Sequence, residues 1–454
     1  MAPIGSASVS GVIPDLPASP PFALRGTVLT PLDGGATRHL VDGVVEVDGR
    51  GRIGAVREAR GAEPGAIDLR PHVLLPGMID LHAHLPQLPN AGLGAGLDLL
   101  TWLERYIFPL ERRWEDADHA AWLSAAAFRA FATAGTTTLL AYGAVYKASM
   151  DRAFRAAEEH GIRAILGKVM MDRITYDETI EPSTILDRSV RESAELIERW
   201  HGADDGRLGY AVTPRFAVSC TAELLRESAA LAARTGTWWQ THVSEDPGEI
   251  AEVERLFPEA RDYVDVYDRA GGLGARTILA HAIHLSDREL ARLVETNTRV
   301  AHCPASNLFL ASGIMPLARY REAGLGVGLG TDVAGGPDPS IFAVMQVGAY
   351  AQAALRTIGG ESRPVLGPLD WLRLGTLDGA RSLGLQDRIG SLEVGKEADV
   401  IAVDPRVTEA VRELAYDPAK IDPADVMSRL IFRARADMVR GAWVRGRLLE
   451  GPPA

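Results

Sequence analysis

The sequence predicts an α/β protein in which a (β/α)₈ TIM barrel lies beside a small β-sandwich domain formed from both chain termini. Three observations support this prediction. Eight apolar runs of strand length alternate with helical patterns between residues 72 and 385. Five of these runs end in histidine or aspartate. Short β segments separated by glycine-containing turns occur on both sides of this region.

The two ends of the chain are expected to pair with each other. Residues 1–20 are rich in Ser, Pro, Gly and Ala and lack the basic and apolar regions of a signal peptide, so we expect a flexible tail. Residues 21–71 and 386–454 both contain short strand-like runs with turns. Because an isolated hairpin is only marginally stable, we expect these two segments to form one composite β domain beside a barrel at residues 72–385.

The central region predicts barrel strands connected by helices. Three helical patterns stop at a glycine, at Gly135, Gly161 and Gly236, and residues 286–289 have the Ser-x-x-Glu pattern that opens a helix. A doubly wound open sheet is the alternative fold, but no glycine-rich nucleotide loop follows the first strand. Barrels of this kind carry their active sites at the C-terminal strand ends. The predicted strands are residues 73–82, 136–142, 163–171, 208–216, 238–242, 277–281, 299–302 and 327–332.

The connection between the first strand and the helix near Ala120 is unusually long and contains several aromatic residues, Trp102 and Phe108 among them. Long loops in compact domains are commonly lids or binding walls. A helix at residues 97–110 that packs on the barrel rim is the second interpretation, and the two are compatible.

Composition argues against nucleic-acid and membrane partners. The chain has 46% apolar and 24% charged residues and a net charge of -12, with no basic stripe that could bind phosphates. No apolar run approaches the roughly 18 residues of a membrane span. The two cysteines, Cys220 and Cys303, are far apart in the sequence, which favours reduced thiols in a cytosolic protein over a disulfide.

Histidine and aspartate at the strand ends predict a metal site. His82 and His84 are spaced i, i+2 at the end of the first strand, so both rings point to the same side. A His-x-His pair alone is a weak signal, but His242 and Asp332 end two later strands. Imidazole nitrogens and a carboxylate suit zinc, and iron accepts the same set. We therefore expect His82, His84, His242 and Asp332 to hold one Zn²⁺ per chain, with Fe²⁺ as the alternative.

The same strand ends supply groups for proton transfer. Water bound to such a metal has a pKa near 7 and acts as a hydroxide nucleophile, and Asp332 is expected to take its proton. Glu245, just past the fifth strand, is expected to shuttle a proton to a ring nitrogen or a leaving amine. His281 is expected to hydrogen-bond the hydroxide or to stabilise a developing alkoxide. His284 is interpreted as structural, and His302 as a buried, hydrogen-bonded histidine.

The motifs around these residues resemble a known family. They are residues 76–84, His242 with Glu245, His281, residues 330–332 and residues 390–399. Together they resemble the amidohydrolase superfamily, in its single-metal deaminase branch. A narrower similarity, to the guanine deaminase family, extends from about residue 70 to residue 400. It rests on five segments in matching order, namely residues 84–87, 100–109, 213–216, 302–308 and 330–336.

The resemblance implies a barrel of the metal-dependent hydrolase type that converts guanine to xanthine and ammonia, as a cytoplasmic homodimer of purine catabolism. It also implies that Gln87 and Arg215 hydrogen-bond the purine edge and that Phe216 stacks on its face. An amide, a guanidinium fork and an aromatic ring suit these roles. The expected substrate contacts are Gln87, Arg215, Phe216, His242 and His281, and the expected catalytic residues are Glu245, Asp332 and His281.

One departure from the family pattern occurs at residues 337–340, Pro-Asp-Pro-Ser, in a loop expected to border the pocket. A deaminase of a related aminated ring, such as 8-oxoguanine, ammeline or another aminotriazine, or a pterin, is therefore the alternative function. A binuclear cyclic amidohydrolase would need a lysine carbamate from the fourth strand, whereas the candidate Lys168 lies on the third. A non-catalytic scaffold would lack a ligand or the proton shuttle, and every such position is filled here.

Overall fold

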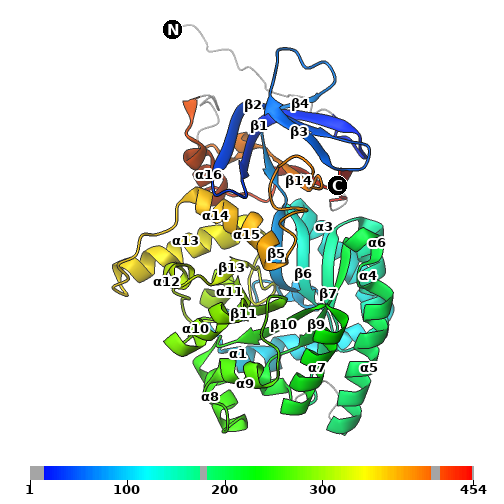
Figure 1. Ribbon diagram of the computed structural model, residues 1–454, viewed down its shortest axis with the longest axis vertical. Coiled ribbons are helices and arrows are strands. Elements are labelled where there is room, and N and C mark those ends of the chain that lie inside the picture. Colours follow the sequence, from blue (N-terminus) through cyan, green and yellow to red (C-terminus); the bar gives the residue numbers. More distant parts are fainter. Residues whose placement is uncertain (1–14, 174–180, 411–419, 452–454) are drawn as a thin grey trace.

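The computed structural model describes residues 15–173, 181–410 and 420–451, which form a barrel and a separate sheet. Figure 1 shows the sheet at the top and the barrel with its surrounding helices below it. The predicted α/β fold class, with a barrel and a small β domain built from both termini, is confirmed.

The barrel contains eight parallel strands in sequence order within the described residues. It closes between its first and last strands, where the backbone nitrogen of Asp332 donates to the carbonyl oxygen of His82 at 2.7 Å and that of His84 donates to Val333 at 2.9 Å. All eight predicted strands are therefore present. They are β5 (Met78–His84), β6 (Thr136–Tyr142), β7 (Arg163–Gly167), β9 (Leu208–Pro214), β10 (Trp238–Val243), β11 (Thr277–His281), β12 (Arg299–His302) and β13 (Gly326–Leu329), and β8 (Val169–Met170) pairs with β9.

Apolar side chains from successive strands fill the barrel interior. Ile79, Leu140 and Ile278 belong to one buried cluster although they come from three different strands. The indole of Trp238 belongs to the same cluster and donates to the carbonyl oxygen of Leu383 at 3.2 Å. Since such layers pack as tightly as any protein core, they give the strand ends a rigid base.

The connections between the strands are mostly helices, which surround the barrel in Figure 1. The helix ends follow the sequence signals: the helix before Gly161 stops where that residue adopts φ of 93°, and Ser286 and Glu289 form the predicted capping box. None of the described helices is long and apolar enough to cross a membrane. The longer helices are α3 (Ala117–Thr133), α4 (Lys147–His160), α5 (Pro182–Trp200), α7 (Ala222–Thr235), α8 (Pro247–Leu256), α10 (Asp287–Glu295), α13 (Ile341–Thr357) and α16 (Pro423–Phe432). The shorter ones are α6 (Ala203–Gly206), α9 (Tyr263–Arg269), α11 (Pro304–Phe309), α12 (Leu317–Glu322), α14 (Pro368–Leu374), α15 (Leu377–Ser382), η4 (Ala217–Ser219) and η5 (Pro405–Thr408).

The long connection after β5 is helical throughout much of its length and crosses the C-terminal side of the barrel. We call residues 97–115 the rim segment. It contains a single turn of π-helix at Leu103–Ile107, a feature that is frequent at functional sites. Its elements, with the turn that precedes it, are η1 (Leu85–Asn90), α1 (Leu99–Trp102), η2 (Leu103–Ile107), α2 (Phe108–Arg112) and η3 (Arg113–Glu115).

The β domain is one curved seven-stranded sheet that combines both termini. The segment before its edge strand at residues 53–58 joins the segment before its strand at residues 400–403, where Arg52 and Glu397 form a β-bridge, and the sheet has a core of its own around Val28, Val45 and Trp443. Its strands, in spatial order, are β16 (Arg447–Leu448), β15 (Val439–Val444), β14 (Val400–Val403), β4 (Ile67–Pro76), β1 (Phe22–Pro31), β2 (Thr37–Val47) and β3 (Ile53–Glu58).

Parts of the terminal segments lie outside the described residues, namely residues 1–14, 411–419 and 452–454. Most of the tail expected at residues 1–20 therefore lies outside the described part of the chain. The residues that follow contact the sheet: the indole of Trp443 donates to the carbonyl oxygen of Pro17 at 2.9 Å, and the Leu448 amide donates to Ala18 at 3.1 Å.

The prediction of a single strand at residues 73–82 is wrong. The apolar run is divided at Gly77 between β4, which pairs with β1 and β14 in the sheet, and β5, which pairs with β6 in the barrel. A Cβ atom at Gly77 would lie 2.0 Å from the hydroxyl oxygen of Thr137, so only glycine allows this close approach. Hydrophobic patterning could not reveal the division, because both strands are buried.

A buried ion network connects the barrel to the β domain. The guanidinium of Arg163, at the start of β7, bonds Glu397 and lies 3.0 Å from Asp399 Oδ2, just before β14. All three side chains are at most 5% exposed. Burial opposes ionisation of Glu397, but Arg163 and Arg445 outweigh it and lower its pKa to about 2. The network is therefore ionised, with both carboxylates paired, although Nη1 of Arg163 has no hydrogen-bond partner among the described residues.

We expect Arg163→Met to lower the free energy of unfolding by about 3–5 kcal/mol, because it removes the buried guanidinium that pairs with Asp399 and weakens the pairing of Glu397, which keeps Arg388 and Arg445. Arg152→Met is the matched control, since Arg152 pairs with Asp118 where both side chains are at least 50% exposed. That variant should cost less than about 1 kcal/mol. Urea unfolding of the three proteins measures both values, and equal losses would contradict a stabilising role of the network.

Candidate active site

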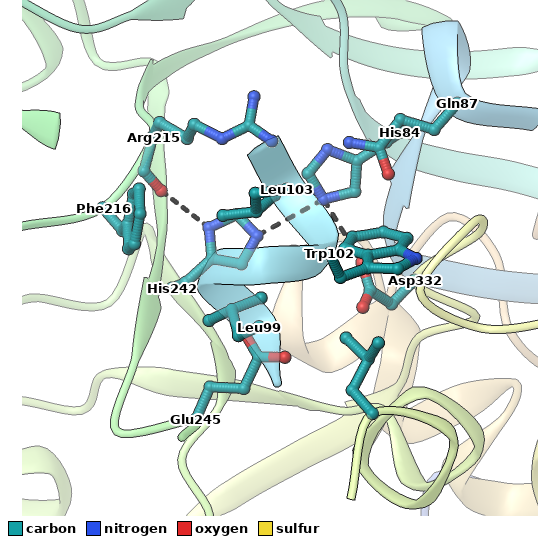
Figure 2. A pocket seen from close by; sticks show the side chains of 11 residues that line it. His84, Gln87, Leu99, Trp102, Leu103, Arg215, Phe216, His242, Glu245 and Asp332 are labelled. Carbon is teal, nitrogen blue, oxygen red and sulfur yellow. Dashed lines mark hydrogen bonds and ion pairs between the residues drawn. The ribbon is translucent and has the colours of Figure 1, made fainter. Parts of the chain in front are cut away.

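A small pocket lies at the C-terminal ends of the barrel strands. Figure 2 shows His84, His242, Glu245 and Asp332 around a short helix of the rim segment that carries Leu99, Trp102 and Leu103. The lining residues are His84, Gln87, Leu99, Trp102, Leu103, Arg215, Phe216, His242, Glu245, Leu310 and Asp332.

The four predicted metal ligands form one cluster in this pocket. One ligand atom each from His82, His84, His242 and Asp332 lies within 4.8 Å of all the others. Asp332 Oδ1 is 3.1 Å from His82 Nε2 and 3.2 Å from His84 Nε2. His84 Nε2 is also 3.3 Å from the Nε2 atom of His242. Residues from β5, β10 and the end of β13 are thus brought together as predicted.

The chemistry of this donor set fits a divalent metal. Burial lowers the pKa of His82, His84 and His242, so the imidazoles are neutral and their ring nitrogens carry lone pairs. Burial alone would raise the pKa of Asp332, but the neighbouring histidines hold it well below its usual value, so this group is a carboxylate. His242 Nδ1 donates to the carbonyl oxygen of Arg215 at 2.6 Å, which leaves Nε2 for a metal.

A second buried group consists of Glu245, His281 and Asp332. His281 Nε2 is 3.3 Å from Glu245 Oε2 and 3.8 Å from Asp332 Oδ2. Burial, and next the charge of Asp332, raises the pKa of Glu245 well above its usual value. Burial lowers the pKa of His281 to about 4. A protonated carboxyl group beside a neutral imidazole can donate a proton and recover it.

Helix α11 orients two of these groups. Ser306 Oγ donates to Asp332 Oδ2 at 2.6 Å, and His281 Nδ1 donates to Asn307 Oδ1 at 2.9 Å. The second bond makes His281 Nε2 the acceptor atom, and this atom faces Glu245 and Asp332. Both residues lie in the segment 302–308, which the family resemblance includes, but their roles were not predicted.

Asp80 fastens the first barrel strand to the last. It accepts hydrogen bonds from the backbone nitrogen and hydroxyl of Thr331 at 3.0 and 2.5 Å and from the backbone nitrogen of His82 at 3.1 Å. Burial raises the pKa of this carboxyl group to about 7. Because His82 and Asp332 are next to these contacts, Asp80 fixes the distance between two of the predicted ligands.

Backbone strain occurs at the same strand ends. Ser244, His281 and Asp332 have positive φ values of 47°, 71° and 48°, which residues with a side chain rarely adopt. Such positions cost of order 1–3 kcal/mol each and concentrate at functional sites. These positive φ values were not predicted, because neither the identity of a side chain nor the hydrophobic pattern indicates the backbone conformation.

Gln87 and Arg215 also line the pocket and share a partner. Glu111 of α2 is fully buried and accepts from Gln87 Nε2 at 2.7 Å and from Arg215 Nη1 at 2.5 Å. The guanidinium of Arg215 also lies 5.3 Å from the ring centroid of Phe108. Sequence analysis missed Glu111, which is 24 and 104 residues away from its two partners.

The rim segment forms a wall of the pocket. Leu99, Trp102 and Leu103 line it from one side, and Phe216 lines it from the end of β9. Trp102 is held by its indole nitrogen, which donates to the carbonyl oxygen of Leu93 at 3.0 Å. The interpretation of this connection as a binding wall is therefore confirmed, and its buried side chains also pack on the barrel.

The expectation that residues 337–340 border the pocket is wrong. Asp338, Pro339 and Ser340 instead line a separate hollow beside α3 and α13, together with residues such as Arg129 and Ala434. The chain turns away from the site directly after the buried residues that follow β13. This sequence departure therefore does not alter the lining of the pocket.

Three other residues that the sequence suggested for comparison are not members of the metal cluster: Lys168, His284 and His302. Lys168, considered for a carbamate, pairs with Glu192 of α5 at 3.3 Å and belongs to no potential metal group among the described residues. His284 bonds the carbonyl oxygen of Ser312 at 2.8 Å, as a structural residue would. His302 is buried as expected, but its ring nitrogens have no hydrogen-bond partner among the described residues, which corrects that part of the prediction.

Comparisons with known proteins agree with this geometry. The model of the amidohydrolase family matches residues 73–449. A protein named "Probable guanine deaminase" from Deinococcus radiodurans is 38% identical over 90% of this chain and 93% of its own length. Guanine deaminase from Escherichia coli is 39% identical over 82% of this chain and 83% of its own. The structure of guanine deaminase from C. acetobutylicum with guanine in the active site superposes with a TM-score of 0.85 and 27% identity, covering 94% of this chain and 99% of that one.

We expect His242→Ala to weaken divalent-metal binding by more than about 100-fold. Removing a residue that only hydrogen-bonds a metal ligand typically lowers metal affinity by about 10–100-fold, and removing the ligand itself should lower it further. Titration of the metal-free protein with zinc measures the affinity. His284→Ala, outside the cluster, is the control and should bind like the wild type. Wild-type affinity in the His242 variant would contradict the predicted ligand set.

Proposed function

The chain belongs to the amidohydrolase family, and we propose that it hydrolyses guanine to xanthine and ammonia, a step of purine catabolism. The observation that supports this most strongly is that one small pocket contains both the metal-type cluster and the Gln87–Arg215 pair. The guanine deaminases described above match most of the chain, and the structure with bound guanine matches the whole barrel and sheet.

His82, His84, His242 and Asp332 are the residues that would hold the metal. A divalent metal at this position lowers the pKa of water and so supplies the nucleophile at neutral pH. Zinc is our choice, because three imidazoles and a carboxylate are ligands that it favours, and Fe²⁺ is the alternative. Asp332 has its Oδ2 atom bonded by Ser306 and within 3.8 Å of His281, so it is placed to accept the proton of the attacking water.

Glu245 is the proposed proton shuttle. Its buried, protonated carboxyl group gives its proton to the ring nitrogen beside the carbon that bears the amino group. A C–O bond forms at that carbon, and the C–N bond then breaks. The amino group receives the proton that Asp332 took from the water and leaves as ammonia, while the hydroxyl proton of the intermediate returns to Glu245 as the C=O bond forms. His281, whose Nε2 is an acceptor, is proposed to accept a hydrogen bond from the attacking water or hydroxide.

Recognition of the ring is assigned mainly to pocket side chains that are not metal ligands. Gln87 and Arg215 are proposed to bind the purine edge, and Phe216 to cover its face, with His242 and His281 in contact at the reacting carbon. The apolar and aromatic side chains that line the pocket suit a flat heterocycle. Because residues 337–340 lie away from this lining, the observation that favoured another aminated ring no longer does so.

The proposal extends to the setting of the enzyme. Cys220 and Cys303 are both buried and free, which supports a reducing, cytoplasmic environment. A homodimer is proposed on the family resemblance, and a small-molecule substrate is the proposed partner.

Ammonia release from the purified, metal-analysed protein tests the substrate. The panel is guanine, 8-oxoguanine, ammeline, cytosine, adenine and isoxanthopterin, and we expect guanine to be turned over fastest. Faster ammonia release from another ring would agree with the proposed reaction type but would overturn the assignment of guanine as the substrate. Two metals per chain with no ammonia from any ring would overturn the reaction itself.

We expect Glu245→Gln to lower kcat for guanine by about 10²–10⁴-fold while metal content is unchanged, because the amide cannot donate and recover a proton in the same way. Glu254→Gln, an exposed position of the following helix, is the matched control and should keep wild-type turnover. Wild-type kcat in the Glu245 variant would exclude this residue as the shuttle.

A further inference from the structure

Glu111 connects both side chains that are proposed to bind the purine edge. Gln87 lies on η1 after the first barrel strand, Arg215 follows β9, and Glu111 lies on α2 of the rim segment. Each carboxylate oxygen of Glu111 accepts from a different partner, Oε1 from Gln87 and Oε2 from Arg215. Three segments that are separate in the sequence are therefore held together by one buried carboxylate.

Glu111 also determines the direction of the Gln87 amide. A carboxylate only accepts hydrogen bonds, so Gln87 must turn its NH₂ group toward Glu111. The amide oxygen then faces the opposite way, where the backbone nitrogen of Ala334 lies 3.4 Å from it. Arg215 is fixed in the same manner, between Glu111 and the ring of Phe108. The donors and acceptors that face the pocket are thus set before a ligand arrives, which lowers the entropic cost of binding.

The charge of Glu111 offsets that of Arg215. The two side chains are 0% and 2% exposed, so water screens neither of them. A buried guanidinium without a carboxylate would attract anions strongly, because Coulomb interactions are larger where water is excluded. With Glu111 in place, this side of the pocket presents a neutral pair to the ligand.

We propose that Glu111 is a positioning residue for substrate recognition, which fixes the hydrogen-bonding pattern of Gln87 and Arg215 and makes the pocket prefer a neutral ring over an anionic one. This inference rests on the proposed function. It gives the rim segment a second role besides covering the pocket, because Glu111 of α2 orients Gln87 and Arg215.

Steady-state kinetics of Glu111→Gln test the positioning role, with whichever ring of the panel the wild type turns over fastest. We expect KM to rise about 10–100-fold, the range for loss of hydrogen bonds to charged groups, with kcat changed less than about threefold and metal content unchanged. Glu104→Gln, an exposed carboxylate of the same rim segment, is the matched control and should change neither constant. A loss confined to kcat, or a loss of metal, would overturn the proposal.

A double-mutant cycle separates positioning from general damage to the rim segment. If Glu111 acts mainly through Arg215, Glu111→Gln should raise KM much less in an Arg215→Met background than in the wild type. Fully additive effects of the two substitutions, together with a lowered melting temperature of the Glu111 variant alone, would assign it a purely structural role and overturn the proposal.

Binding of xanthine and hypoxanthine, measured by calorimetry at about pH 8, tests the charge balance without turnover. Xanthine is then mostly an anion and hypoxanthine mostly neutral. In Glu111→Gln the affinity ratio should shift toward xanthine by about tenfold relative to the wild type, since Arg215 is no longer offset. An unchanged ratio would overturn the preference for neutral rings. Failure of the wild type to deaminate guanine would contradict the proposed function only, because the kinetic tests of Glu111 use the ring that the wild type turns over fastest.

Discussion

The closure of the barrel between β5 and the end of β13 is the constraint on which the site depends. Backbone hydrogen bonds join Asp332 to His82 and His84 to Val333 at this seam. Asp80 adds side-chain bonds across the same seam to Thr331. Two of the proposed ligands come from the first strand and one from the last, so no metal cluster can form until the strands have met. The distances within the cluster are set by this closure, and only His242 has to be supplied from elsewhere.

The fold and the metal cluster could be predicted from the sequence for a simple reason. Parallel barrel strands share one C-terminal edge, so residues at the ends of several strands must lie close together whatever their separation in the chain. Histidine and aspartate at those ends are therefore informative without coordinates. The same rule located Glu245 and His281, and the structure brings both to the edge of the cluster.

Other features of the fold and the site could not be predicted, because they depend on contacts that follow no periodic sequence pattern. The division of an apolar run at Gly77 reflects the closeness of Thr137, and Glu111 reaches Gln87 and Arg215 through the particular path of the rim segment. Proximity in sequence also misled: residues 337–340 follow the last ligand closely, yet line a different hollow. Sequence patterns report which face of an element is buried, and they do not report where an irregular connection goes.

The ion network of Arg163 limits how the gene for this enzyme can recombine. Its guanidinium belongs to the barrel, while both of its carboxylates come from the residues that lead back into the sheet. A gene fragment that encoded the barrel alone would expose the polar ends of this network and leave the guanidinium without its counter-ions. The barrel and the sheet therefore cannot be exchanged separately between proteins without a compensating change at this seam. Recombination should preserve the two as one unit, although they are distinct in shape and are joined through the termini of a single chain.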